Sequence, residues 1–137
     1  MKNKEIKSYK FESNRKVIND VEEILTDLNK EIKIPEERFI NFQIAVSEAL
    51  INCIVHGNKE DKNKFVTVKI ENLNDSVKIY IKDKGSGFDF SDIPDPTEIS
   101  NLYKEHGRGI FIIKSLVDNF ECVSGAGGTE FILTMNK

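Results

Sequence analysis

The stretch FQIAVSEALINCIVHGN, residues 42–58, is apolar almost all the way round a helix, yet it carries three polar side chains at four-residue intervals. These side chains are Glu48, Asn52 and His56. Residues four apart lie on the same face of an α-helix, one turn apart, and a helix that is apolar all round packs inside a protein. The pattern therefore predicts a buried helix with a polar row, and the rest of the sequence must explain that row.

Length and composition limit the possible explanations. The chain has 137 residues, which suits one domain with a real core, and a net charge of -3. Its lysines and arginines are scattered among acidic residues, so we expect no direct nucleic-acid partner. No apolar run approaches the roughly 18 residues of a membrane span, and no apolar N-terminal segment resembles a signal peptide. We expect a soluble, cytoplasmic protein without membrane contact, whose Cys53 and Cys122 are buried, reduced thiols.

The spacing of apolar residues predicts two helices up to Gly57, and the second of them contains the opening stretch. Apolar residues recur at three- and four-residue steps up to Ile32, and Ser13 is the predicted N-cap of that helix. Pro35 fits the first position of a second helix that runs to Gly57, a natural C-terminal stop. Before both helices, residues 5–11 alternate in the way that a short strand does.

After Gly57 the apolar period changes from helical to two. The segments FVTVKI (65–70) and VKIYIKD (77–83) predict an antiparallel pair with one covered face. Asp83 is in phase with the apolar residues of its strand, so its carboxylate should point toward the covered side, where an unpaired charge is costly. Most aspartates at strand ends only cap a turn, but Gly85 and Gly87 follow at once and permit close backbone approach.

The rest of the chain alternates between polar and apolar segments. Residues 88–106 are polar and have no clean period, which favours a loop or lid. Gly107 and Gly109 then precede an apolar helix; they could expose backbone N–H groups to an anion, or form only a hinge. A last hairpin follows, in which Thr129 is in phase with inward apolar residues.

Other phosphate-binding and catalytic motifs fail on spacing. A Walker loop needs glycine before Lys114 and Ser115, but Ile113 stands there. No glycine begins a complete GxGxxG pattern, and no serine lies in a nucleophile elbow. His56 and His106 are too far apart in sequence to form a helical metal pair.

The remaining motifs, in this order, resemble the histidine-kinase-like (GHKL) ATPase superfamily. EALINCIVHG is similar to its N box, DKGSGFD to its first glycine box, HGRGIFIIKSLVD to the lid end and second glycine box, and GGTEF to the last box. The closest likeness is to bacterial anti-sigma factors that act as serine-protein kinases, and it covers roughly residues 10–135.

The resemblance implies a role for each box in binding ATP and Mg²⁺. Glu48 would be the general base, and Asn52 would hold Mg²⁺. Asp83 would accept the adenine amino group, assisted by Thr129. The glycine-rich segments would line the nucleotide, with Gly85 and Gly87 beside the base and sugar, and Gly107, Arg108 and Gly109 beside the phosphates. For His56, contact with the phosphates and a purely structural role both stay open.

The resemblance also implies a fold and a function. The fold would be an α/β (α+β) two-layer sandwich, the Bergerat ATP-binding fold, with a mixed, mostly antiparallel sheet and helices on one face, in a single domain 1–137. The function would be that of a serine/threonine-protein kinase that regulates transcription. It would phosphorylate an anti-anti-sigma partner of the STAS type, sequester a sigma factor and form a homodimer. The alternatives are a non-catalytic module whose partner binding is gated by nucleotide, and a domain that binds no nucleotide.

Overall fold

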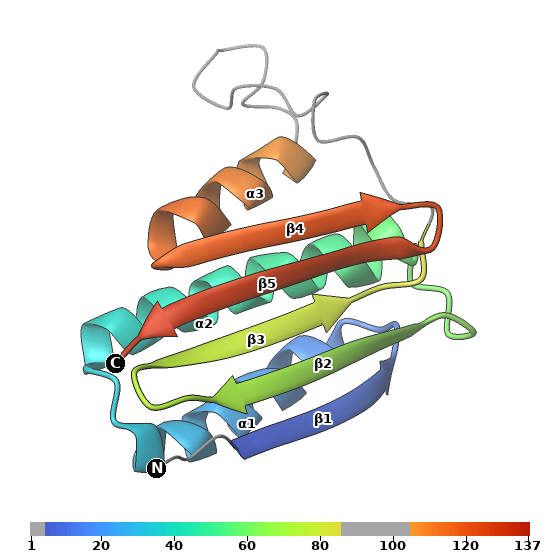
Figure 1. The fold of residues 1–137 in the computed structure, drawn as a ribbon. Helices are drawn as coiled ribbons and strands as arrows, with labels where there is room; N and C mark the ends of the chain where they lie inside the picture. Colours follow the sequence, from blue (N-terminus) through green and yellow to red (C-terminus); the bar gives the residue numbers. More distant parts are fainter. Residues whose placement is uncertain (1–4, 86–104) are drawn as a thin grey trace.

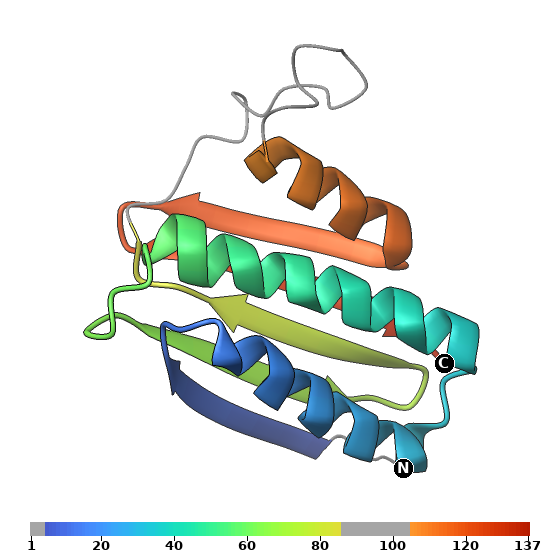
Figure 2. The ribbon, with the colours of Figure 1, turned by 180° about the vertical axis from the view of Figure 1, so that it is seen from behind.

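The structure, a computed structural model, describes residues 5–85 and 105–137, without the side chains of residues 105–108. Strands and helices form two layers, with the helices on one face of the sheet (Figures 1 and 2). The elements in chain order are β1 (Glu5–Glu12), α1 (Lys16–Ile32), α2 (Glu36–Ile51), the π-helical η1 (Asn52–Gly57), β2 (Phe65–Asn72), β3 (Ser76–Lys82), α3 (Glu105–Leu116), β4 (Asn119–Gly125) and β5 (Gly128–Asn136). The predicted two-layer α+β sandwich is therefore confirmed.

The sheet has five strands in the order β1-β2-β3-β5-β4. All four pairings among these described strands are antiparallel, which confirms the predicted hairpins; the expected parallel component of a mixed sheet does not occur among them. Opposite residues such as Val68 and Ile81, or Ile79 and Leu133, pair side by side on the covered face. This alternation fixes the register, because a slip of one residue would turn every apolar side chain to solvent.

The core lies between the sheet and α1, α2 and α3. Each helix contributes its apolar face, and the buried residues of α1 are Val17, Val21, Leu25 and Leu28. The covered strand faces contribute, among others, Val66, Val68, Ile70, Val77, Ile79, Ile81, Phe131 and Leu133. Burial of this apolar surface, at about 25 cal/mol per Å², holds the two layers together.

The predicted N-cap at Ser13 is wrong. Helix α1 begins at Lys16, and the Asn14 Oδ1 accepts a hydrogen bond from the Lys16 backbone N–H at 3.0 Å. The Ser13 side chain is buried instead, where its hydroxyl donates to the Lys64 carbonyl and accepts from the Asn58 amide. Long-range hydrogen bonds thus take the hydroxyl that the local sequence pattern assigned to the helix end.

Helix α2 and η1 together form the central helix, which ends at Gly57 as predicted, with Pro35 at the N-cap rather than inside the helix. By length and composition alone, Glu36–Gly57 could cross a membrane, so the expectation that no segment approaches such a span is too simple. Its buried residues, which include Phe42, Val46 and Leu50, belong to the core cluster. The core helix of a soluble protein meets the same criterion, so this helix alone is weak evidence for a membrane span.

Helix α3 begins earlier than predicted, at Glu105 rather than after Gly109. Gly107 and Gly109 therefore lie inside its first turns and do not precede it. The predicted lid at 88–106 falls outside the described residues except for its last two positions, which belong to α3. Ile110 and Ile113 are buried against α2, as the period predicts.

Candidate functional site

Several predicted site residues meet where α2 and η1 pass the first turns of α3. Gly109 of α3 lies so close to this helix that a Cβ added to it would be 3.1 Å from the Asn52 Nδ2 and 3.3 Å from the Glu48 Oε1. Any residue other than glycine would push against both side chains. The structure thus brings Glu48, Asn52 and Gly109 together, although α3 is distant from α2 in sequence.

The side chain of Asn52 is buried and oriented by one hydrogen bond. Its Nδ2 donates to the Glu48 backbone carbonyl at 3.0 Å. The Asn52 Oδ1 is buried and has no hydrogen-bond partner among the described residues. A buried acceptor without a partner costs about 1 to 3 kcal/mol and calls for an explanation, such as a bound ion or water.

An amide oxygen of this kind fits the magnesium ion that the resemblance implies. Mg²⁺ prefers hard oxygen ligands and usually takes only one or two from the protein, with the rest from water and phosphate. The described residues contain no cluster of three or more His, Cys, Asp or Glu side chains that could hold a metal by themselves. Asn52 could therefore serve as the protein ligand of a magnesium ion that a nucleotide also binds.

The carboxylate of Asp83 forms a second polar centre, just beyond the end of β3. The residue is only 2% exposed, as its strand phase predicts. Its Oδ1 accepts hydrogen bonds from the backbone N–H groups of Gly85 and Thr129, both at 2.9 Å. The Asp83 backbone N–H in turn donates to the Thr129 carbonyl at 2.9 Å. The start of β5 and the turn after β3 are thus tied to one carboxylate.

Two glycines, Gly57 and Gly128, pack closely against Asp83, and a third, Gly85, packs against Gly57. A Cβ on Gly57 would lie 2.1 Å from the Asp83 Oδ2, and a Cβ on Gly128 would lie 2.2 Å from the Asp83 carbonyl oxygen. A Cβ on Gly85 would lie 2.4 Å from the Gly57 carbonyl oxygen. Gly128 also has a φ of 122°, which side chains rarely allow. A side chain at Gly57 or Gly128 would therefore collide with Asp83.

Two thiols lie within the electrostatic reach of Asp83. Burial raises the pKa of Cys53 well above its ordinary value, and the negative charge of Asp83 raises it further. Burial also raises the pKa of Cys122 to about 12, again with a contribution from Asp83. Both cysteines are free, but only Cys53 is fully buried, so the prediction of two buried thiols holds for one of them. Neither thiol is ionised near neutral pH, which makes both poor nucleophiles.

The structure describes the other predicted site residues in less detail. Thr129 is buried, and its hydroxyl lies 2.9 Å from that of Ser124. Gly87 lies outside the described residues, and of Gly107 and Arg108 only the helical backbone is described. His56 is half-buried within η1, and its role stays open.

Sequence reasoning missed three residues that shape the site. Gly57 lies in the predicted N box and Gly128 in the predicted last box, but neither was given a role at Asp83, which both contact. Asn58, which is fully buried, was not predicted at all. The one available signal was the position of Asn58 directly after an apolar helix that ends in His-Gly.

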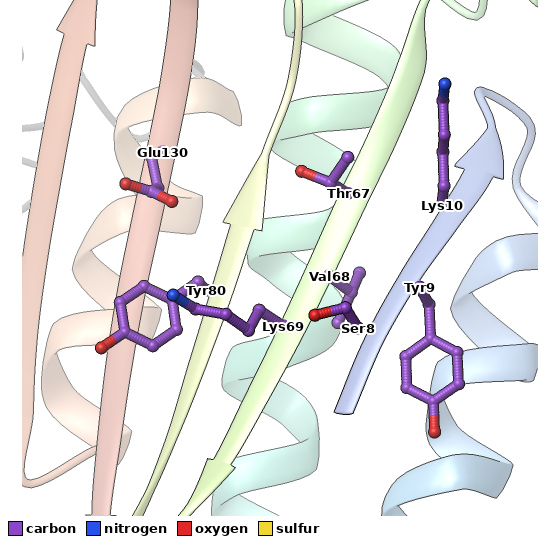
Figure 3. Close-up of a pocket in the computed structure, with 8 residues that line it drawn as sticks. All are labelled: Ser8, Tyr9, Lys10, Thr67, Val68, Lys69, Tyr80 and Glu130. Carbon is purple, nitrogen blue, oxygen red and sulfur yellow. The ribbon is translucent and has the colours of Figure 1, made fainter. Parts of the chain in front are cut away.

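A hollow of about 420 Å³ lies elsewhere, on the open face of the sheet (Figure 3). Its lining includes Lys69 and Tyr80, whose strands carry Ile70, Ile79 and Ile81 on the opposite face. The Lys69 ammonium lies 4.1 Å from the centroid of the Tyr80 ring. The polar row of α2 is on the other side of the sheet, so this hollow is separate from the site.

Tyr80 on this open face is held by a short hydrogen bond. Its hydroxyl donates to the Glu71 Oε1 at 2.6 Å. This hydrogen bond raises the pKa of Tyr80 to about 12, with smaller contributions from burial and from the negative charge of Glu71. Two polar side chains of the open face, Tyr80 and Glu71, are therefore hydrogen-bonded to each other.

The family of the chain follows from its sequence. Residues 11–135 match the family model of the histidine kinase-like ATPase domain. The chain belongs to this family. The histidine kinase-like ATPase domain thus covers nearly all of the chain, and the likeness predicted from its four boxes is confirmed at the level of the family.

Two curated relatives of this ATPase domain carry the name serine-protein kinase RsbW and come from Staphylococcus aureus strains MSSA476 and JH9. Each is 36% identical over 94 residues, which is 64% of this chain and 59% of the relative. The chain thus spans less than two thirds of the length of these relatives.

Solved structures show the same fold. The RsbU and RsbW domains of Rv1364c from Mycobacterium tuberculosis superpose with a TM-score of 0.69 at 19% identity, over 96% of this chain and 32% of that one. The histidine kinase domain from Erythrobacter litoralis EL346 superposes with a TM-score of 0.57 at 19% identity, over 74% of this chain and 46% of that one. At these identities the likeness concerns the fold alone.

Proposed function

We propose that this chain is an ATP-dependent serine/threonine-protein kinase that acts as an anti-sigma factor. The family assignment and the relatives named serine-protein kinase support this proposal. The observation that carries it is the meeting of the Glu48 carboxylate with Asn52, whose buried Oδ1 has no described partner, beside Gly109 of α3. A carboxylate and a free amide oxygen next to a close helix backbone suit phosphoryl transfer, which depends on positioning and charge neutralisation.

In this proposal Asp83 binds the adenine base, and the polar row of α2 serves the magnesium ion and the phosphates. The Asp83 carboxylate, held by the backbone of Gly85 and Thr129, accepts the amino group of adenine. Asn52 supplies its Oδ1 to magnesium, which neutralises phosphate charge when it is bound. The start of α3, with Gly107, Arg108 and Gly109, lies beside the phosphates, where helix N–H groups favour anions.

Glu48 is the proposed general base. It takes the proton of the attacking serine hydroxyl while the hydroxyl oxygen bonds to the γ-phosphorus. The bond to ADP breaks, and its electron pair leaves on the ADP oxygen. Because holding ATP needs no base, Glu48 separates a kinase from a protein that only binds nucleotide.

The proposed partners follow the relatives and the resemblance. The phosphorylated partner is an anti-anti-sigma protein of the STAS type, and the unphosphorylated partner competes with a sigma factor for the kinase. We place the kinase in the cytoplasm, as a homodimer. The non-catalytic alternative keeps the same nucleotide site and lacks only the transfer step.

The test is phosphate transfer from γ-labelled ATP to a purified STAS-domain protein of the same host. The matched control is Glu48→Gln, which keeps the shape of the side chain and removes the base. We expect acid-stable phosphoserine on the partner, with transfer at least about 100-fold slower in Glu48→Gln at similar ADP affinity. If both proteins bind ADP and neither transfers phosphate to the partner, the chain is a nucleotide-gated binding module.

A further inference from the structure

Asn58 is a fully buried polar residue at the end of η1, directly after Gly57. Its backbone N–H donates to the Cys53 carbonyl at 2.8 Å and so closes the helix. The ends of η1 and β3 and the start of β2 gather at one end of the sandwich (Figures 1 and 2). Asn58 lies at the centre of this junction.

The nitrogen and the oxygen of the Asn58 side-chain amide form hydrogen bonds with two different parts of the chain. The Nδ2 donates to the Ser13 hydroxyl at 2.8 Å and also lies 3.2 Å from the carbonyl oxygens of Lys64 and Phe65. The Oδ1 accepts the backbone N–H of Lys84 at 2.8 Å. The donor end therefore joins the start of α1 to the start of β2, and the acceptor end holds the turn that follows β3.

That turn is part of the proposed nucleotide site. Lys84 stands between Asp83 and Gly85, and its own side chain is exposed. The Gly85 backbone N–H donates to the Asp83 Oδ1, and Gly85 packs directly on the backbone of Gly57. The hydrogen bond from the Lys84 N–H to Asn58 thus holds the turn of residues 83–85 against the end of η1.

We propose that Asn58 is a positioning residue of the nucleotide site, which holds the turn of residues 83–85 so that the Asp83 carboxylate keeps its place toward adenine. This inference rests on the proposed function, because it requires that Asp83 binds the base. Asn58 itself need not touch the nucleotide. It acts through the Lys84 backbone, and its amide is suited to this role because it has a donor and an acceptor at opposite ends.

The two ends of the amide give a matched pair of variants. Asn58→Ala removes the bond to Lys84, whereas Ser13→Ala removes only a partner of the donor end. A third variant, Lys84→Pro, removes the same N–H from the other side and leaves Asn58 in place; Lys84 does not have a positive φ. Lys84→Pro decides the question if Asn58→Ala does not fold.

The first measurement is amide exchange at Lys84 without nucleotide, by NMR. We expect at least about tenfold faster exchange in Asn58→Ala and little change in Ser13→Ala, because exchange reports local opening. The second measurement is ADP affinity by calorimetry. We expect about fivefold weaker binding in Asn58→Ala and in Lys84→Pro, no further loss in the double variant, and less than a twofold change in Ser13→Ala.

The inference is overturned if Asn58→Ala keeps both Lys84 protection and ADP affinity, or if Ser13→Ala loses ADP affinity equally, which would make the junction merely structural. With ATP as substrate, a positioning role raises KM more than it lowers kcat. Failure of the proposed nucleotide site looks different, because the native protein then binds no ADP at all, whereas failure of phosphate transfer alone leaves ADP binding and this test intact. In that case unchanged Lys84 exchange in Asn58→Ala still refutes the inference.

Discussion

Replacement of Gly57 by alanine should destabilise the protein and abolish binding of adenine nucleotides. The added Cβ would lie 2.1 Å from the Asp83 Oδ2 and 2.6 Å from the Asp83 Cγ, far inside contact distance. The carboxylate cannot simply turn away, because its Oδ1 accepts hydrogen bonds from Gly85 and Thr129. The variant must therefore move the turn after β3 or break these bonds.

The free energy of unfolding should fall by about 2 to 4 kcal/mol. Each hydrogen bond to a charged group contributes about 1.5 to 3 kcal/mol, and one or both bonds to Asp83 are lost. Against this loss, alanine is favoured over glycine in a helix by about 0.5 to 1 kcal/mol, and Gly57 lies at the end of η1 without a positive φ. The steric cost therefore exceeds the gain in helix propensity.

Urea unfolding and ADP calorimetry test this prediction, with Gly127→Ala as the control. A Cβ on Gly127 meets no atom within 4 Å, so its stability should change by less than about 0.5 kcal/mol. For a urea m-value of about 2 kcal/mol/M, Gly57→Ala should lower the midpoint by about 1 to 2 M. Equal midpoints and equal ADP affinities in the two variants would refute the packing of Asp83 against Gly57.

Two further predictions concern Asn52 and Tyr80. Asn52→Ala should cost only about 1 kcal/mol of stability, because it removes one hydrogen bond to the Glu48 carbonyl, and should remove the Mg²⁺ dependence of ADP affinity. Calorimetry with and without Mg²⁺ checks this, and equal Mg²⁺ enhancement in both proteins would contradict it. Glu71→Gln should lower the pKa of Tyr80 from about 12 toward about 10. Since the folded state favours the neutral phenol, the stability from this bond is complete below pH 10 and is lost as the pH rises through 12. Phenolate absorbance, with Tyr80→Phe as the reference, measures the shift, and an unchanged titration would argue against the bond.

Most of the fold follows from apolar periods that the sequence displays directly. Strands β2 and β3 alternate strictly, and their register places Asp83 on the covered side, where it is found. The start of α1 could not be read in the same way. Ser13 has the residue type of an N-cap, but its hydroxyl bonds to residues 45 and 51 positions away, and no local pattern records such partners.

In the candidate site, too, features set by local sequence were predictable and long-range contacts were not. Glu48 and Asn52 were predictable, because four-residue spacing on an α-helix is a local property. The glycine contacts with Asp83 join η1, the turn after β3 and the start of β5, so only the folded chain reveals them. Glycine also has no side chain whose chemistry could indicate a site. It matters here because it leaves room for Asp83.

The central helix leads from the proposed magnesium ligand to the proposed adenine site through a π-helical turn. Helix α2 keeps the α period through Ile51, and Asn52–Gly57 then follow with one more residue per hydrogen-bonded turn, a feature frequent at functional sites. Gly57 at the end of this turn lies against the Asp83 carboxylate, and the Oδ1 of Asn58, the next residue, accepts the Lys84 backbone N–H. The end of one helix thus connects the proposed magnesium ligand to the proposed adenine site.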